Sequence, residues 1–168
     1  MLTAFILDLQ KIHDNDGLTV KHGKIHSYLG INFEYSTDGE FKVSMIKYAD
    51  QILDNFPNMI TSTHRSPAVG HLFKIREESK RKLLPEEQVR HFHHLVAQML
   101  FLYVRARLDL QTVVSFLTKQ VKNPDEDDWG NLKRGLKYLK GTCHITLVLK
   151  VDSLSTIIRW VAASHSVH

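Results

Sequence analysis

The chain has 168 residues, an ordinary hydrophobic content of 43 % and a formal net charge of +4 that leaves eleven histidines uncounted. This length suits a single domain or two small lobes, and the mild positive charge is compatible with contacts to phosphate without requiring them. A single cysteine, Cys143, rules out an internal disulfide and fits a reducing intracellular compartment, cytoplasmic or nuclear, and no apolar run approaches the roughly 18 to 20 residues that a membrane span requires.

An amphipathic helix is predicted at residues 2–13, where apolar side chains recur at helical spacing. Only Met1 precedes it, so we expect a chain cut at its start. The polar stretch 14–17 breaks this helix, and residues 18–20 predict a short strand that turns toward the next element at His22-Gly23.

Residues 26–45 predict one β-hairpin, because apolar and polar side chains alternate with a period of two on both sides of a turn at 37–39. Gly30, in the string Tyr28-Leu29-Gly30-Ile31, has no Cβ and would let another backbone approach closely. A β-bulge in an ordinary meander explains this glycine equally well. The alternating apolar residues are Leu29, Ile31, Phe33, Tyr35, Phe41, Val43 and Met45.

A helix at 46–56 follows and is closed by Pro57. Periodicity is then lost over 58–84, which is the expected boundary between lobes. The basic residues of this connector are interrupted by Glu77 and Glu78, and this favours a solvated linker over phosphate contacts.

Three further helices predict a small bundle. The first follows Pro85, the second is expected to be capped by Asp109 and to end at Asn123-Pro124, and the third starts at the acidic run 125–128 and ends at Gly141. Their inward faces comprise Val89, Phe92, Val96, Met99, Leu100 and Tyr103, then Val113, Val114, Leu117 and Val121, then Trp129, Leu132, Leu136 and Leu139.

Two strands, at 143–151 and 156–163, would form a C-terminal β-hairpin that either packs on the bundle or lacks its partners. The predicted fold class is therefore α+β, with a β-hairpin, a helical bundle and a second hairpin. The outer face of the last helix carries four basic residues, for which solvation is the simpler explanation and phosphate contact the alternative. They are Lys133, Arg134, Lys137 and Lys140.

Two patterns suggest catalysis or metal binding, and neither is specific. Asp127-Asp128 resembles the paired carboxylates that hold Mg²⁺, but an acidic first turn of a helix explains the pair better. His91 and His94 share a helix face, yet the following positions offer no strong ligand. We therefore assign no catalytic and no metal-binding residue.

Several strings together resemble the pol region of copia-type LTR retrotransposons over nearly the whole chain, and only their combination is specific. The matching strings are Leu18-Thr19-Val20 with Gly23-Lys24, His26-Ser27-Tyr28-Leu29-Gly30, Phe92-His93-His94-Leu95-Val96-Ala97 with Leu100-Phe101-Leu102, Arg105-Ala106-Arg107 with Asp109-Leu110-Gln111-Thr112, and Leu136-Lys137-Tyr138-Leu139-Lys140-Gly141-Thr142.

The resemblance implies four parts: the end of a reverse transcriptase palm at 1–57, a connector at 58–84, a helical thumb and connection at 85–142, and the start of a truncated ribonuclease H domain at 143–168. The family's paired catalytic aspartates precede the first helix, so the match begins after them. Ala162 replaces the first metal-binding carboxylate of ribonuclease H, and Leu108 replaces a proline, which would loosen a turn.

These departures predict a catalytically inactive fragment of an RNA-directed DNA polymerase, with no cofactor of its own although the parent family uses Mg²⁺. The resemblance implies a primer-gripping hairpin at Tyr28, Leu29, Gly30 and Ile31. The residual function that we expect is binding of an RNA/DNA duplex by this hairpin and the basic helix face. The alternative is a non-catalytic module or scaffold that associates with the missing polymerase domains, away from any membrane.

Overall fold

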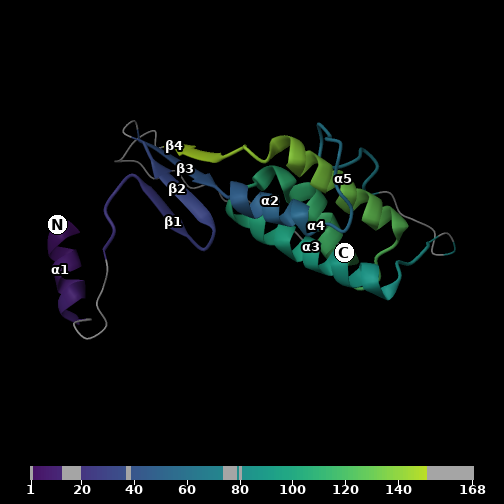
Figure 1. Cartoon of the computed structure of the whole chain (residues 1–168), viewed down its shortest axis with the longest axis horizontal. Helices are drawn as coiled ribbons and strands as arrows, with labels where there is room; N and C mark the ends of the chain where they lie inside the picture. The colour runs from purple at the N-terminus through teal and green to yellow at the C-terminus, as the bar shows by residue number, and fades with distance from the viewer. Residues whose placement is uncertain (1, 13–19, 37–38, 74–78, 80, 151–168) are drawn as a thin grey trace, which may run out of the picture.

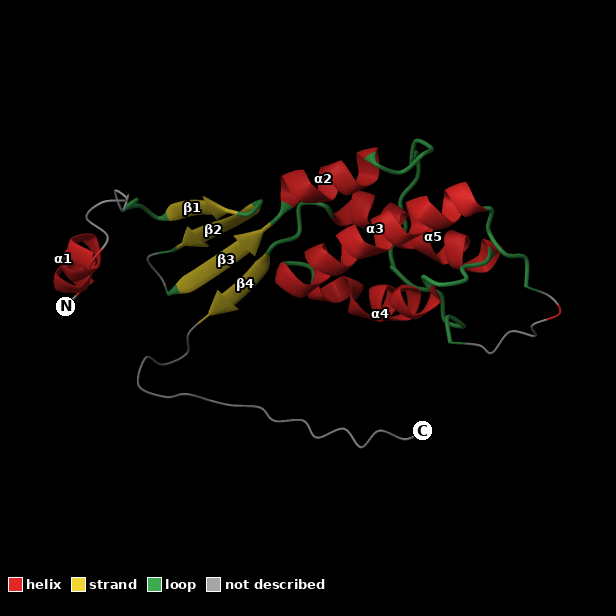
Figure 2. Ribbon diagram, turned by 90° about the horizontal axis from the view of Figure 1, so that it is seen from below, coloured by secondary structure: helices red, strands yellow, loops and turns green. Residues whose placement is uncertain are grey.

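A computed structural model describes residues 2–12, 20–36, 39–73, 79 and 81–150 and confirms the α+β class (Figure 1). Figure 2 shows the strands gathered at one end of the helices, with the first helix standing apart beyond the sheet. In chain order the elements are α1 (Leu2–Ile12), β1 (Ile25–Tyr28), β2 (Ile31–Tyr35), β3 (Glu40–Ser44), α2 (Ile46–Asp54), α3 (Glu86–Arg105), the 3₁₀ helix η2 (Leu108–Leu110), α4 (Gln111–Gln120), α5 (Glu126–Thr142) and β4 (Leu147–Lys150).

The sheet is an antiparallel meander of four strands in the order β1-β2-β3-β4. The hairpin predicted over 26–45 is confirmed where β2 pairs with β3 across the turn, and it is wrong before Ile31, where β1 is a separate strand. Leu29 and Gly30 both have positive φ, 50° and 77°, and together make a two-residue turn between paired residues Tyr28 and Ile31. Because that turn reverses the chain, the alternation of side chains does not continue through Leu29.

β4 pairs with β3, with Val43 opposite Leu147 and Phe41 opposite Leu149. The predicted partner at 156–163 lies outside the described residues. Among the described residues, the partner of β4 is β3 of the N-terminal sheet. This pairing places the leucines of β4 beside the apolar residues of β3, which explains why the strand joins a sheet that is distant in sequence.

Some short elements of the prediction fall partly or wholly outside the described residues. These are the break at 14–17, most of the strand at 18–20 and most of the turn at 37–39. Val20 is described and does not belong to a strand.

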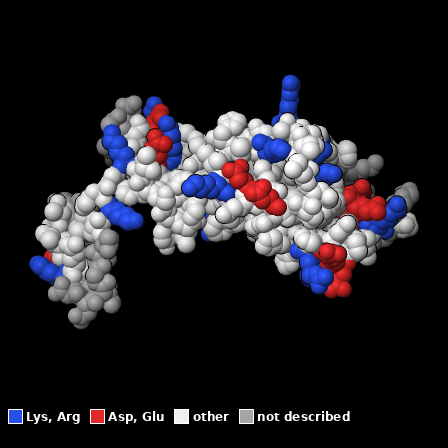
Figure 3. Space-filling model, in the orientation of Figure 1, with Lys and Arg blue, Asp and Glu red and all other residues white. Residues whose placement is uncertain are grey.

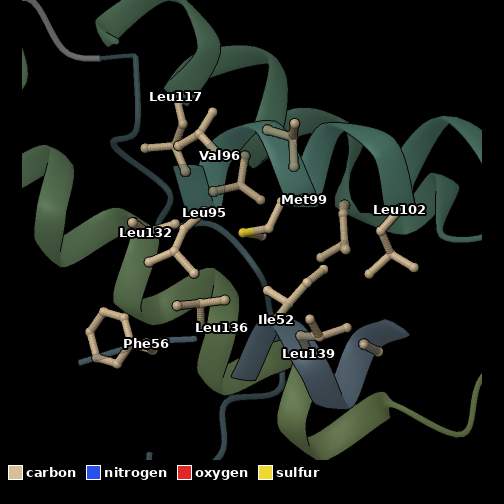
Figure 4. Close-up of a cluster of buried hydrophobic side chains, with 14 of the residues drawn as sticks. Ile52, Phe56, Leu95, Val96, Met99, Leu102, Leu117, Leu132, Leu136 and Leu139 are labelled. Atoms are coloured by element: carbon tan, nitrogen blue, oxygen red, sulfur yellow. The ribbon is translucent and has the colours of Figure 1, made fainter. Parts of the chain in front are cut away.

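The core forms where α2, α3, α4 and α5 meet, and side chains from these helices point toward one another around Met99 (Figure 4). On α3 the buried stripe includes Leu95 and Leu102, whereas Leu100, predicted to face the core, is 40 % exposed. At 3.6 residues per turn the observed stripe is centred between Leu95 and Met99, which leaves Leu100 at its edge.

Two helix starts were predicted from capping residues, and one is confirmed. Asp125 caps α5: its carboxylate accepts a hydrogen bond from the Asp128 N–H at 2.9 Å, and the Asp128 carboxylate accepts one from the Asp125 N–H at 3.0 Å. Asp109 does not cap α4, whose N-cap is Leu110 without a side-chain hydrogen bond. The chain enters α4 through η2, and this leaves the Asp109 carboxylate directed at other partners.

The described part of the 58–84 connector packs against the helices. Ile60, Leu72 and Leu84 in it are almost fully buried, and Leu84 donates its N–H to the Pro124 carbonyl at 3.0 Å. Within the described ranges, no helix is both long and apolar enough to cross a membrane.

Candidate nucleic-acid interface

The turn between β1 and β2 is an exposed apolar tip. Tyr28 and Leu29 are each 66 % exposed, and a Cβ built on Gly30 would meet nothing within 4 Å. Gly30 therefore marks a turn, not a bulge in a strand, and its role is to accept positive φ. Leu29 shares this backbone region without being a glycine or asparagine, which costs roughly 1 kcal/mol.

Hydrogen bonds on either side of the tip hold it in place. Ser27 Oγ donates to Asn32 Oδ1 at 2.6 Å across the two strands, and His26 Nε2 lies 2.8 Å from the Gly23 carbonyl oxygen. Because Asn32 also pairs with Ser44, the tip lies at the end of the sheet from which β3 leads into α2. The predicted residues Tyr28, Leu29, Gly30 and Ile31 are thus brought together at one fixed position.

The second predicted group of residues lies along α5. Lys133 and Lys140 are exposed, whereas Arg134 and Lys137 are half-buried. Figure 3 shows basic side chains over α5, whose acidic residues are confined to the first turn. The tip and the α5 residues belong to separate elements, so these two predicted sets form two distinct surfaces.

Residues 60–64 cross the middle and the C-terminal end of α5, where the prediction placed an open face. Lys140 Nζ donates to the Ile60 carbonyl, and the His64 N–H donates to the Lys137 carbonyl at 3.4 Å. A Cβ at Gly141 would lie 3.1 Å from Cβ of Thr63, so the glycine permits this close crossing.

Positive charge is concentrated at this crossing. Burial lowers the pKa of His64, and the nearby charges of Arg134 and Lys137 lower it further. The Nε atom of Arg134 is buried and has no hydrogen-bond partner among the described residues. His64 was not singled out by the sequence, because a lone histidine in an irregular segment carries no pattern.

The paired carboxylates Asp127 and Asp128 have separate environments. Asp128 is fully buried in the capping box, while Asp127 is exposed on the first turn of α5. The interpretation of this acidic run as a helix start is confirmed, and the buried member of the pair is committed to backbone hydrogen bonds.

The histidines of α3 have different environments. His91 Nδ1 lies 3.0 Å from the Glu87 carbonyl oxygen, and His93 and His94 are exposed. In the part of the chain that the structure describes, no three or more His, Cys, Asp or Glu side chains gather as metal ligands would.

A polar cluster around Arg107 was missed from the sequence. The Arg107 guanidinium donates to both carboxylate oxygens of Asp109, at 2.9 and 2.7 Å, and the Tyr138 hydroxyl donates to Asp109 at 2.8 Å. Burial tends to raise the pKa of Asp109, but these hydrogen bonds and the charge of Arg107 outweigh it and hold the pKa below its usual value. The string Arg105-Ala106-Arg107 with Asp109 contributed only to the copia-type resemblance, and Asp109 was predicted as a helix cap, so this cluster was not predicted.

Comparison with known proteins finds a distant similarity to a plant protein. The chain is 28 % identical over 131 residues to the uncharacterized mitochondrial protein AtMg00810 of Arabidopsis thaliana, and the match covers 78 % of this chain. It covers 52 % of the Arabidopsis protein, so the chain spans about half the length of that curated relative. No family model matches, and no solved structure matches.

Proposed function

We propose that this chain is a segment of a copia-type retrotransposon polyprotein that contacts a nucleic-acid duplex without itself carrying out polymerisation or ribonuclease H cleavage. The 28 % identity to the Arabidopsis mitochondrial protein shows that this segment recurs in another protein, and the origin in a retrotransposon is proposed from the motifs. The strings that resemble copia-type reverse transcriptases supply the identity of the segment: the end of a palm, a thumb with its connection, and the start of ribonuclease H.

The observation that carries the binding proposal is the conformation of Leu29. A leucine at φ 50° on a two-thirds exposed turn gives up stability both through backbone strain and through its contact with water. Such cost at a surface position favours a role in binding, because an asparagine would serve the turn better. Apolar contact from Tyr28 and Leu29, with the close approach that Gly30 allows, fits the sugar and base edges of a primer end.

We propose that the chain is not catalytic because the carboxylate of Asp128, one of the candidate metal ligands, is hydrogen-bonded in the capping box of α5. Two-metal phosphoryl transfer needs carboxylates that converge on the ions, and Asp128 is instead occupied by the start of α5. With primer, template and Mg²⁺, the purified chain should incorporate nucleotides no faster than a blank reaction. Template-dependent extension by this chain would refute this part of the proposal.

Binding is tested by fluorescence anisotropy with a short RNA/DNA hybrid over a range of salt concentrations. The Leu29→Asn variant preserves positive φ and removes the apolar tip, so affinity should fall about tenfold. The salt slope, which is the slope of log affinity against log salt concentration, should stay the same. Lys133→Gln on exposed α5 should lower the salt slope by about one and leave the tip contact intact.

Leu108→Asn is the matched control, because Leu108 is also an exposed leucine, at 53 %, on a different element. It should bind the hybrid as the wild-type chain does. Equal affinities for the Leu29→Asn and wild-type chains, or no binding at low salt, would remove the binding proposal.

A second candidate function is that of a non-catalytic subunit that associates with an intact polymerase chain. The observation that favours it is α1, which stands apart from the bundle with Phe5, Leu7 and Ile12 exposed by 60 %, 52 % and 74 %. Co-purification of a tagged chain with a copia-type polymerase, lost in a Phe5→Ser/Ile12→Ser variant, would support this function over nucleic-acid binding.

A further inference from the structure

The crossing of residues 60–64 over α5 brings together two segments that carry positive charge and no carboxylate. Residues 58–73 contain Arg65 and two histidines but no Asp or Glu, and residues 129–142 contain four Lys or Arg residues and no Asp or Glu. The two segments are joined by the His64 N–H to Lys137 carbonyl hydrogen bond at 3.4 Å. Like charges are therefore held close together by the fold.

Three side chains, His64, Arg134 and Lys137, carry the charges that act on one another at the crossing. Arg134 and Lys137 project from one face of α5 and lie near enough to His64 for their charges to act on it. Arg65 follows His64 in its own segment. Lys140 is already used, because its ammonium group donates to the Ile60 carbonyl and holds the segment on the helix.

One donor of this group is unused although water is excluded from it. The Nε atom of Arg134 is buried, and within the described ranges it has no hydrogen-bond partner. A buried, unpaired donor on a cation costs free energy that an acceptor would restore. A guanidinium beside a second cation is the arrangement that binds the oxygens of a phosphoryl group.

We propose that Arg134, Lys137 and His64 form a binding site for a phosphoryl oxyanion at the crossing of residues 60–64 over α5. Arg134 donates hydrogen bonds from its guanidinium, Lys137 supplies a point charge, and His64 binds as the imidazolium. This site is separate from the β1–β2 tip and goes beyond the proposed binding of a duplex, since it requires only a phosphate group.

Binding at this site is linked to protonation of His64. Burial and two cations keep the pKa of His64 below its ordinary value in the free protein, and a bound anion offsets the repulsion from Arg134 and Lys137. The pKa therefore rises when the site is filled. By linkage, the anion binds more tightly as the pH falls toward and below about 6.5, the usual histidine value.

The test is an NMR titration of the histidine ring signals of the whole chain with inorganic phosphate, and in parallel with sulfate, whose charge does not change over this pH range. Either anion should raise the pKa of His64 by about one unit, saturably, and should leave the ring signals of His91 on α3 where they are without the anion. A titration in which His64 responds no more than His91 would overturn the proposal.

Variants test the roles of the cations. Arg134→Gln and His64→Gln should each weaken phosphate binding about tenfold, and His64→Gln should also remove its pH dependence. Lys119→Gln, an exposed lysine near the end of α4, should leave binding unchanged. Wild-type affinity in both site variants would contradict the proposal, and a circular dichroism melt of each variant shows that it is folded.

Three further ligands distinguish the source of the phosphate group. The first ligand is a dinucleotide that contains one phosphodiester, and the second is a phosphomonoester. The third is a glutamate peptide of equal charge, which serves as the comparison. Response to either phosphate compound supports the site and identifies its source, whereas an equal response to the peptide would overturn the assignment to phosphate. These results do not depend on whether the Leu29 tip binds the hybrid. The proposal of a phosphate site and the proposal of duplex binding can therefore be contradicted independently.

Discussion

Arg107 and Thr142 join the C-terminal ends of α3 and α5, although the two residues lie 35 positions apart in the chain. The Arg107 guanidinium donates to the Thr142 carbonyl at 2.8 Å and to the Thr142 hydroxyl at 2.7 Å. Thr142 is the last residue of α5, and Arg107 follows α3, so the contact fixes where α5 stops before β4 returns to the sheet. The Arg107 side chain is 2 % exposed, and the contact is therefore shielded from water.

Replacing Arg107 by methionine should destabilise the chain by about 3 kcal/mol, because Asp109 loses its buried cation and Thr142 loses both hydrogen bonds. Urea unfolding measures this change. Arg105→Met is the control: Arg105 is exposed and lies 3.5 Å from the centre of the Phe101 ring, a contact worth less than about 1 kcal/mol. Equal losses in the two variants would show that the Arg107 contacts add nothing.

The lowered pKa of Asp109 predicts a specific loss of stability in acid. A carboxyl group with a folded pKa below its unfolded value of about 3.9 contributes stability above that pH, and the contribution disappears as the pH falls through the folded pKa. The difference in unfolding free energy between wild type and Asp109→Asn should therefore be greatest near neutral pH and shrink below about pH 4. A difference that stays constant down to about pH 2 would contradict the assigned pKa direction.

The capping box at the start of α5 predicts a contrast between adjacent acidic residues. Asp125→Ala removes the cap and an ion pair with Arg81 at 3.1 Å, and should cost about 2 kcal/mol in a thermal or urea melt. Glu126→Ala removes only an exposed pair with Lys82 at 3.7 Å and should cost less than about 0.5 kcal/mol. If Glu126→Ala costs as much as Asp125→Ala, the negative charge near the helix end matters more than the hydrogen-bonded cap.

The β1–β2 turn predicts that substitutions at two neighbouring positions change the stability of the chain in opposite directions. Leu29→Asn should stabilise the chain by about 0.5 to 1 kcal/mol, because asparagine tolerates positive φ better than leucine. Gly30→Ala should destabilise it by about 1 kcal/mol, because alanine resists φ 77° although the space for its Cβ is open. Destabilisation by both substitutions would mean that Leu29 is held by contacts and not strained.

Helices with local signals could be predicted from the sequence. The acidic run at 125–128, followed by Trp129, Leu132, Leu136 and Leu139 at helical spacing, predicts both the start and the inward face of α5, and three of these four residues are fully buried while Trp129 is partly buried. Such features depend on residues within a few positions of one another, so the sequence alone displays them.

The features that the sequence did not reveal depend on distant residues or on unusual turn chemistry. The turn at Leu29 was missed because leucine is not a turn residue, and the alternating pattern continued through it. The pairing of β4 with β3 and the contact from Arg107 to Thr142 link residues far apart in the chain, which no local pattern encodes. The crossing of His64 over α5 is non-local in the same way.

The most direct test of the proposed function is amide hydrogen exchange of the whole chain with and without a bound RNA/DNA hybrid at low salt. We predict slower exchange at residues 27–32, centred on Leu29, with no comparable change in α4, and loss of this protection in Leu29→Asn. Protection that is confined to other surfaces, or equal in Leu29→Asn and wild type, would contradict a role of the β1–β2 turn in gripping nucleic acid.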